Sequence, residues 1–433
     1  MKHFIGKIMR GTHRTTLIFI GIGILHIFFR FYNLELWAKV GWDQMDHAWA
    51  ATRILYEHSY PLQGIMAKYN SGITVGPLYY YFVALFYYFT RFDPIASPIV
   101  AGVTSILSFL TLYCVVRSIH GVRVALIASF IYAVFSPYIA ADRMQLPTNF
   151  IPMVSFLIFY ALYRVMLGTP RYILLLAAIS GLSLHFHFTS VFYPIMAMFA
   201  LPFFPRKRET LGYLLVSVPI FGIFLLPQAI YDLQVKTHST IGATLSYLQT
   251  YYHGFHLRRM LQLLHDAVIE FEIVLGYRWL RPVALVFLPL YSVIVSRQEK
   301  RSHWFTLTYL IVVWIIVPWV SFTLYSGEIT SYYFSSLRFI AIMMAAYLTL
   351  WFWDRRLRIL QLAVVIFWAV QSVLSVQQFF QTSSGLFPGL RASMIQLIQD
   401  GKTVPFKEND VYYYLYYIDT TVKGIKPIVE HSP

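Results

Sequence analysis

The chain has 433 residues, of which 58% are hydrophobic and 12% are charged, and its formal net charge is +15. One soluble core could not bury this much apolar surface, so the composition excludes a soluble globular protein and indicates an integral membrane protein. The basic residues lie in short clusters between apolar segments, which argues against a nucleic-acid partner. The single cysteine, Cys114, excludes an internal disulfide framework and any Cys-x-x-Cys metal site.

Twelve apolar segments approach the length that a helix needs to cross ~30 Å of hydrocarbon. Helices are expected because backbone polar groups at membrane depth must be satisfied within the segment. The first segment follows a basic stretch and has no small-residue cleavage site after it, so we expect an uncleaved span. The segments are 16–32, 77–92, 97–116, 123–140, 146–167, 171–189, 191–204, 211–230, 279–296, 304–325, 333–352 and 358–378.

Basic clusters, which are typical of short cytoplasmic loops, assign the sides of these segments. They place the N-terminus inside, and the loops 33–76 and 231–277 and the tail outside. Only an odd number of crossings can join an outside loop to the inside cluster at Arg117. One of the two intervening segments therefore does not cross, and the short, tyrosine-rich 77–92 is expected at the outer surface or as a re-entrant segment. The sequence predicts an all-α polytopic bundle with about eleven crossings.

Two further parts are expected on the outer face. Residues 254–277 have helical apolar spacing with charges on the opposite face, which predicts an amphipathic helix on the membrane surface. We expect residues 1–378 to form the transmembrane module and 379–433 a small external segment. In that segment 391–400 resembles a short helix and 411–418 a strand, too small for an independent catalytic domain.

The stretch WDQMDHAWAATRIL, residues 42–55, brings two carboxylates to the first external loop. Asp43 and Asp46 are three residues apart, one helical turn, and the apolar residues that follow predict a partly buried helix. A carboxylate against the membrane face in an apolar loop is placed to act as a general base or to bind a cation. The spacing does not choose between these roles, and a solvated surface acid remains the simplest alternative.

Several motifs resemble those of the integral-membrane GT-C glycosyltransferases, in the bacterial branch related to protein O-mannosyltransferases and aminoarabinose transferases. Asp43-Gln44 is similar to the Asp followed by Glu or Gln that opens that branch's first external loop, and 76–80, GPLYY, to its Gly/Pro-Pro-Leu-Tyr-Tyr stretch. The order of the motifs extends the resemblance over nearly the whole chain. The further matching stretches are ADRMQLPTNFIPMVSFLIFYAL, GLSLHFHFTSVFYPI, LLPQAIYDLQ and GKTVPFKENDVYYYLYYID.

The resemblance implies an enzyme that moves a sugar from a polyprenyl-phosphate donor to a lipid, glycan or protein acceptor on the external face. It assigns the general base of an inverting displacement to Asp43. Relatives often have Glu after this Asp, or a second Asp four residues on, where this chain has Gln44 and His47. Asp46 could substitute, so the choice of base between Asp43 and Asp46 stays open.

The departing phosphate needs cationic or dipolar partners. Arg338, expected about two turns below the outer end of its helix, is one, with snorkelling to the surface as the alternative. Arg143 could act similarly or pair with its neighbour Asp142. His187 matches a His-Tyr position of the family, although a histidine at the mouth of a span is more often a structural hydrogen-bonding group.

The expected substrate pocket includes Asp142, Tyr79 and Tyr80, with an interfacial aromatic belt as the alternative role of the two tyrosines. No cofactor follows from the sequence. Some relatives in the resembled family need a divalent cation and others do not, and Asp46 and Asp142 would be its ligands here.

Two other functions fit the same composition. A flippase or exporter of lipid-linked sugars would place polar groups at the membrane midplane and show broken helices in related halves, whereas the ionisable groups here gather on one face. The second alternative is an inactive relative that scaffolds a cell-envelope assembly, and the departures at Gln44 and His47 leave this possibility open. The expected location is a bacterial inner or plasma membrane, with a periplasmic active site and a cytoplasmic N-terminus.

Overall fold

A computed structural model describes residues 13–37, 41–66, 71–90, 93, 95–235, 240–276, 281–355 and 357–381. Over these residues the chain is helical, with two isolated β-bridges and no strand, which confirms the predicted all-α class. The tail elements expected at 391–400 and 411–418 lie outside the described residues.

Seven described helical stretches are long and apolar enough to cross a membrane, and a pair bent by 68° would make an eighth. All eight coincide with predicted crossings. They are α2 (His13–Phe31), α6 (Ala96–His120), η1 with α9 (Pro147–Phe150 and Ile151–Met166), α12 (Arg208–Gln234), α17 (Arg301–Thr323), η5 with α18 (Ser331–Leu337 and Arg338–Asp354), α19 (Arg358–Gln381), and the bent pair α7 (Val122–Val134) and α8 (Ser136–Asp142).

The other three predicted crossings also fold as helices, but their apolar helical parts are shorter than those of the eight. They are α10 (Tyr172–Ser183), α11 (Phe192–Ala200) between the 3₁₀ turns η2 (Phe188–Val191) and η3 (Leu201–Phe203), and α16 (Arg281–Gln298). Helix length therefore supports up to eight crossings, while all eleven predicted segments are helical. The tyrosine-rich segment, expected at the outer surface or as a re-entrant segment, forms α5 (Leu78–Phe89), whose 12 residues reach about 18 Å. Since α10 has the same length, helix length does not separate this segment from a predicted crossing.

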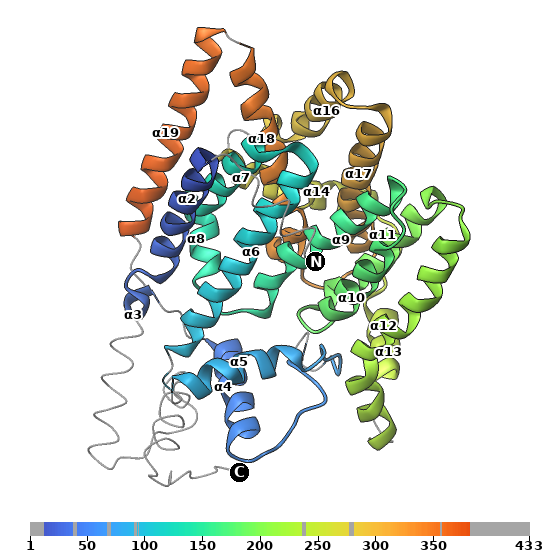
Figure 1. The fold of residues 1–433 in the computed structure, drawn as a ribbon. Coiled ribbons are helices and arrows are strands. Elements are labelled where there is room, and N and C mark those ends of the chain that lie inside the picture. The colour runs from blue at the N-terminus through green and yellow to red at the C-terminus, as the bar shows by residue number, and fades with distance from the viewer. Residues whose placement is uncertain are drawn as a thin grey trace, which may run out of the picture.

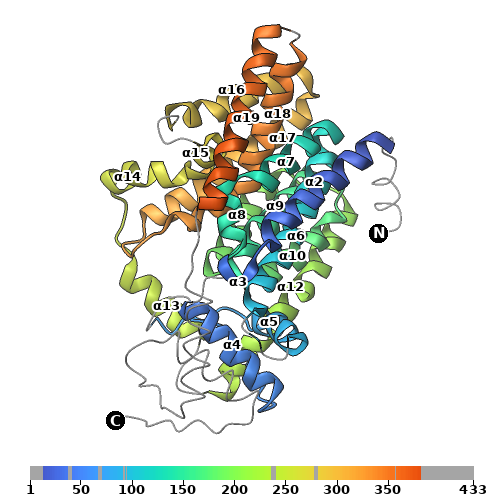
Figure 2. The same cartoon turned by 90° about the vertical axis from the view of Figure 1, so that its left-hand side faces the viewer.

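Figures 1 and 2 show the long helices as one bundle, with α4 (Trp42–Leu55), α5 and α13 (Thr240–Tyr251) together at its lower end. The short α3 (Leu34–Trp37) follows α2. The predicted amphipathic stretch 254–277 divides into α14 (Leu257–Ala267) and α15 (Ile269–Leu275), and α14 packs against α17. The lower end thus carries α4, α5 and α13, from loops that the sequence placed outside, whereas α14 and α15 of the same loop 231–277 lie higher beside the bundle (Figure 2).

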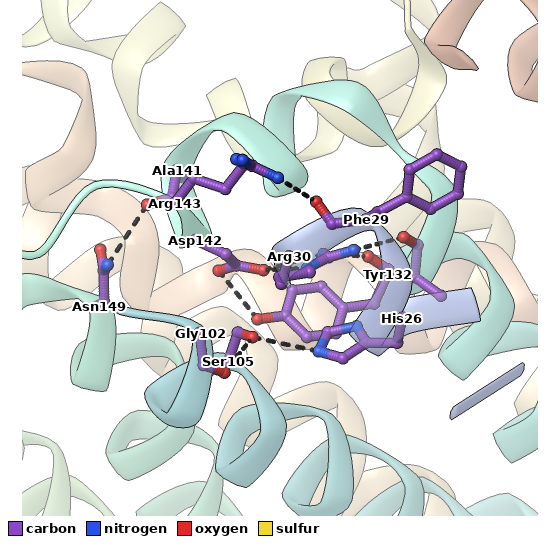
Figure 3. A network of polar contacts seen from close by, with 11 residues as sticks. His26, Phe29, Arg30, Gly102, Ser105, Tyr132, Ala141, Asp142, Arg143 and Asn149 are labelled. Carbon is purple, nitrogen blue, oxygen red and sulfur yellow. Dashed lines mark hydrogen bonds and ion pairs between the residues drawn. The ribbon is translucent and has the colours of Figure 1, made fainter. Parts of the chain in front are cut away.

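A buried ion pair holds the bend between α7 and α8 (Figure 3). Pro137 has no N–H to donate to the carbonyl of Ala133, four residues earlier, and Nη1 of Arg30 donates to that carbonyl instead. Nη2 of Arg30 also donates to Asp142 Oδ2 at 2.9 Å, and Asp142 Oδ1 accepts from Tyr132 at 3.0 Å. The guanidinium of Arg30 is fully buried, so α2 fixes both the bend and the loop after it.

Candidate functional site

The site residues of the first external loop are positioned by the packing of α4 on α5. Met45, Ala48 and Ala51 recur at helical spacing and are buried on one face of α4, as the sequence predicted. The first turns of the two helices then bring Asp43 and Asp46 beside Tyr79 and Tyr80.

Asp43 lies in the first turn of α4 with a partly buried side chain. It makes no hydrogen bond or ion pair with any residue that the structure describes. Removal from water raises the pKa of this carboxyl above its ordinary value, and its charge acts on the neighbouring Tyr79. A carboxylate with a raised pKa and open acceptor oxygens has the properties of a general base.

Asp46 is differently placed, because it accepts a hydrogen bond from the hydroxyl of Tyr80 at 2.6 Å. Burial raises the pKa of Asp46, and the bond from Tyr80 opposes part of that rise. This bond ties α4 to α5. The geometry therefore gives the two carboxylates different surroundings, with Asp43 the more available to a substrate.

Two fully buried side chains beside Tyr79 have polar atoms without a hydrogen-bond partner among the described residues. His47 contacts the ring of Tyr79 at 4.8 Å between centroids, and neither ring nitrogen is hydrogen-bonded. Burial lowers the pKa of His47 to about 3, so its ring is neutral at pH 7. The Gln145 side chain lies beside Tyr79 and helps to stabilise its ionised form, but neither of its amide atoms makes a hydrogen bond of good geometry with a described residue. Such atoms are expected to bind water or a ligand.

Gln145 was missed by the sequence analysis. It follows α8 and reaches the site because Nε2 of Gln44 donates to its backbone carbonyl, a contact between residues 101 positions apart. No local pattern marks such a contact. His47 was noted only as a departure from the resembled family.

Arg338 forms a buried ion pair with Glu270 of α15, at 3.1 Å between Nη2 and Oε1. Its Nε donates to the same carboxylate at 3.3 Å, and its guanidinium lies over the ring of Tyr138 at 5.5 Å. Arg338 therefore does not snorkel to the surface. These bonds leave Nη1 without a hydrogen bond to a described residue, so one edge of the guanidinium can bind an anion.

Arg143 and Asp142 have other partners than expected. Arg143 donates to the carbonyls of Phe29 and Tyr32, each at 2.7 Å, and so caps the C-terminal end of α2. Asp142 pairs with Arg30, so the expected alternative of a pair between Asp142 and Arg143 is wrong. Because Arg30 and Tyr132 occupy both oxygens of Asp142, the geometry places it in the frame of the bundle rather than in a substrate pocket.

The two histidines after α10 serve local structure. His187 caps η2, accepting from the backbone N–H of Thr189 at 3.3 Å, and its ring contacts Tyr333, five residues before Arg338. His185 approaches the start of α5 so closely that a Cβ on Gly76 would lie 1.9 Å from its Nδ1. Glycine at position 76 therefore allows the contact between α5 and the loop after α10.

The described residues do not fit a metal site built on Asp46 and Asp142. No three His, Cys, Asp or Glu side chains in the described ranges are grouped so as to hold an ion. Asp46 accepts from Tyr80, whereas Asp142 is bonded to Arg30 and Tyr132. The two carboxylates therefore have separate partners.

Residues 74–231 match the sequence model of a family described as dolichyl-phosphate-mannose-protein mannosyltransferase. No curated protein matches the chain. ArnT from Cupriavidus metallidurans, solved bound to undecaprenyl phosphate, is similar in structure with a TM-score of 0.61 at 10% identity, over 96% of this chain and 76% of ArnT.

The oligosaccharyltransferase AglB from Archaeoglobus fulgidus, solved with an inhibitory peptide and a dolichol-phosphate, gives a TM-score of 0.58 at 12% identity. That match covers 97% of this chain but 62% of AglB, so the chain spans less than two thirds of the archaeal enzyme. The predicted resemblance is thereby confirmed: this integral membrane protein has the GT-C fold, and residues 74–231 are similar in sequence to the mannosyltransferase family.

Proposed function

We propose that the protein is a glycosyltransferase that moves a sugar from a polyprenyl-phosphate donor to an acceptor on the external face of the membrane. The observation that carries the proposal is Asp43, a partly buried carboxylate without a described partner, in a chain with the GT-C fold. Of the similar structures, that of ArnT contains undecaprenyl phosphate and that of AglB contains a dolichol-phosphate, which supports a donor of this class.

In the proposed reaction an acceptor hydroxyl attacks the anomeric carbon of the donor sugar, and Asp43 accepts the hydroxyl proton. The bond between the anomeric carbon and the phosphate oxygen breaks, and the polyprenyl phosphate leaves with the electron pair. A single displacement inverts the anomeric configuration. Tyr79 is close enough to feel the charge of Asp43, and His47 and Gln145 lie beside Tyr79, so we propose that these three side chains bind sugar hydroxyls.

The proposal is tested by incubating membranes that contain the protein with a panel of radiolabelled polyprenyl-phosphate sugars. Label from at least one donor should move to a lipid, glycan or protein fraction, and the same membranes carrying the Asp43→Asn variant should show background. A flippase would move the lipid-linked sugar across the membrane without breaking its bond to phosphate. Unchanged donor in every sample would therefore contradict the proposed transfer.

Arg338 is proposed to receive the donor phosphate at the open edge of its guanidinium. Arg338→Ala alone would leave Glu270 buried without its partner, which destabilises the protein irrespective of donor binding. The matched comparison is therefore between Glu270→Gln and the double variant Glu270→Gln with Arg338→Ala. We expect the double variant to raise the KM for the donor at least about tenfold over Glu270→Gln. Equal KM values would contradict the phosphate role.

The pH profile gives a second test. Asp43 must be ionised to act as a base, and burial raises its pKa, so kcat/KM should fall as pH decreases through a value above that of an ordinary aspartate. His47, with its pKa lowered to about 3, does not titrate in that range. Asp46→Asn should keep this acid limb if Asp43 causes it. An acid limb lost in Asp46→Asn would transfer the base role to Asp46.

A further inference from the structure

A cluster of arginine and hydroxyl side chains lies where α6 ends and where the loop from α9 to α10 turns. Its members are Ser118, Tyr160, Arg164, Arg171 and Tyr172. α6 begins soon after α5, and its 25 residues extend about 37 Å away from the end that carries α4 and α5 (Figure 1). The cluster is therefore separate from the proposed catalytic site, and none of its members takes part in the proposed transfer.

The hydroxyl of Tyr160 connects the ends of the three helices. It forms a hydrogen bond with Ser118 Oγ at 2.8 Å and accepts another from Nη1 of Arg164 at 3.2 Å. The hydroxyl of Tyr172 interacts with it as well. Tyr160 is buried, whereas Ser118 is exposed, so the cluster is anchored in the bundle and open at its edge.

Two guanidinium groups lie over the ring of Tyr172. The distance from Cζ to the ring centroid is 5.0 Å for Arg164 and 5.8 Å for Arg171. Neither arginine forms an ion pair within the part of the chain that the structure describes. Glu299 acts on the neighbouring hydroxyl of Tyr163, but it forms no ion pair with Arg164. An anion bound here would therefore reduce the repulsion between two positive charges.

The open donors of the cluster define the chemistry of its ligand. Only Nη1 of Arg164 is hydrogen-bonded to a described residue, so Nε and Nη2 of Arg164 and the guanidinium of Arg171 are available. Guanidinium and hydroxyl groups in a site without carboxylates suit a phosphate group, because the arginine fork matches its oxygens.

The surface of α6 beside the cluster indicates what carries the phosphate. Leu107 lies about three helical turns before Ser118, on the same side of α6, and its side chain is 40% exposed. Leu110 is exposed as well. A phosphate at Ser118 therefore adjoins an apolar helix surface that faces the membrane, and this favours a phospholipid over free phosphate.

The expected orientation of the chain places this lipid in the inner leaflet. Arg164 and Arg171 form one of the basic clusters that assign their loop to the inside, and the cytoplasmic leaflet carries anionic lipids. Arginines also reach a membrane surface by snorkelling, without a binding site. A snorkelling side chain needs no fixed partners, however, whereas Arg164 is held by the hydroxyl of Tyr160 and the ring of Tyr172.

We propose that Ser118, Arg164, Arg171 and Tyr172 bind the phosphate of an anionic phospholipid of the inner leaflet. The inference goes beyond the proposed function and holds whether or not the protein transfers sugar. Because the bound headgroup would connect the ends of α6, α9 and α10, it should stabilise the folded protein.

The test titrates detergent-purified protein with phosphatidylglycerol or phosphatidylcholine of equal chain length and follows thermal stability. The variant Arg164→Gln with Arg171→Gln removes both charges of the cluster. The matched control, Arg206→Gln with Lys207→Gln, removes two exposed charges from another loop assigned to the inside. Phosphatidylglycerol should stabilise wild type and control alike. Its apparent Kd should rise at least about tenfold in the cluster variant, since hydrogen bonds to charged groups contribute this much affinity.

Arg164→Gln also breaks the hydrogen bond to Tyr160, so the single variant Arg171→Gln keeps the test independent of folding. Arg171 is exposed, its side chain forms no hydrogen bond or ion pair with a described residue, and its loss should still weaken lipid binding severalfold. An unchanged Kd in both arginine variants would overturn the inference, as would an equal rise in the control or equal stabilisation by the two lipids. Stabilisation by inorganic phosphate alone, with no further gain from phosphatidylglycerol, would overturn the lipid as its source.

Discussion

Asparagine at position 43 is expected to lower sugar transfer about 10²- to 10⁴-fold, the usual contribution of a general base. Asparagine has nearly the shape of aspartate but cannot accept the proton of the attacking hydroxyl. Because Asp43 makes no hydrogen bond or ion pair with a described residue, the substitution breaks no contact that the structure describes. Transfer is measured under single-turnover conditions with saturating donor, so that the loss reports the chemical step.

The same substitution should not weaken the fold at neutral pH. Burial raises the pKa of Asp43 above its unfolded value, so the folded state holds this proton more tightly than the unfolded state. That contribution to stability is present below the unfolded pKa and is lost as pH rises through the folded pKa. At pH 7 the ionised carboxylate opposes folding, and Asp43→Asn should leave the melting temperature unchanged or higher.

Asp46→Asn is the matched control. Its amide oxygen can still accept the hydrogen bond from Tyr80, so α4 stays attached to α5. We expect Asp46→Asn to retain most of the transfer that Asp43→Asn loses. Comparable losses in both variants would mean that the carboxylates act together, and loss in Asp46→Asn alone would make Asp46 the base.

Sequence periodicity predicted the helices because apolar run length is a local property. All eleven predicted crossings are helical over the described residues. The segment of α5, which parity assigned to the outer surface or to a re-entrant position, forms a helix of 12 residues, the same length as α10. The surroundings of Asp43 were predicted in part, because the spacing of the apolar residues after it indicated which face of α4 is buried. The number of crossings was harder to predict, because α10 and α11 have apolar sequences but fewer helical residues than a span needs.

The partners of buried charges could not be read from the sequence. Glu270 lies 68 residues from Arg338 in a stretch predicted as a surface helix, and Arg30 lies 112 residues from Asp142. Arg30 ends the first apolar segment, a position typical of an arginine that reaches the membrane surface. Only packing of α2 against the bend of α7 and α8 shows that it is buried. Asp142 and Arg143 were therefore assigned to substrate or to each other.

The largest expected effect on stability comes from breaking the buried pair of Arg30 and Asp142. Asp142→Ala removes the carboxylate and leaves the guanidinium fully buried with carbonyl partners alone. Removal of one partner of a buried ion pair typically costs ~3–5 kcal/mol. We expect a correspondingly lower free energy of unfolding, measured by denaturant titration in mixed micelles.

The double variant Arg30→Met with Asp142→Leu distinguishes the unpaired charge from the loss of the bend. Apolar replacement of both partners removes the buried charges, so it should recover part of the stability lost in Asp142→Ala. Recovery should be incomplete, because methionine cannot donate to the carbonyl of Ala133 that Pro137 leaves unbonded. The loop after the bend carries Gln145, whose carbonyl accepts a hydrogen bond from Gln44, the neighbour of Asp43. Those molecules of the double variant that fold should therefore transfer sugar more slowly than the wild type. Wild-type transfer by the folded double variant would show that the bend does not position the site.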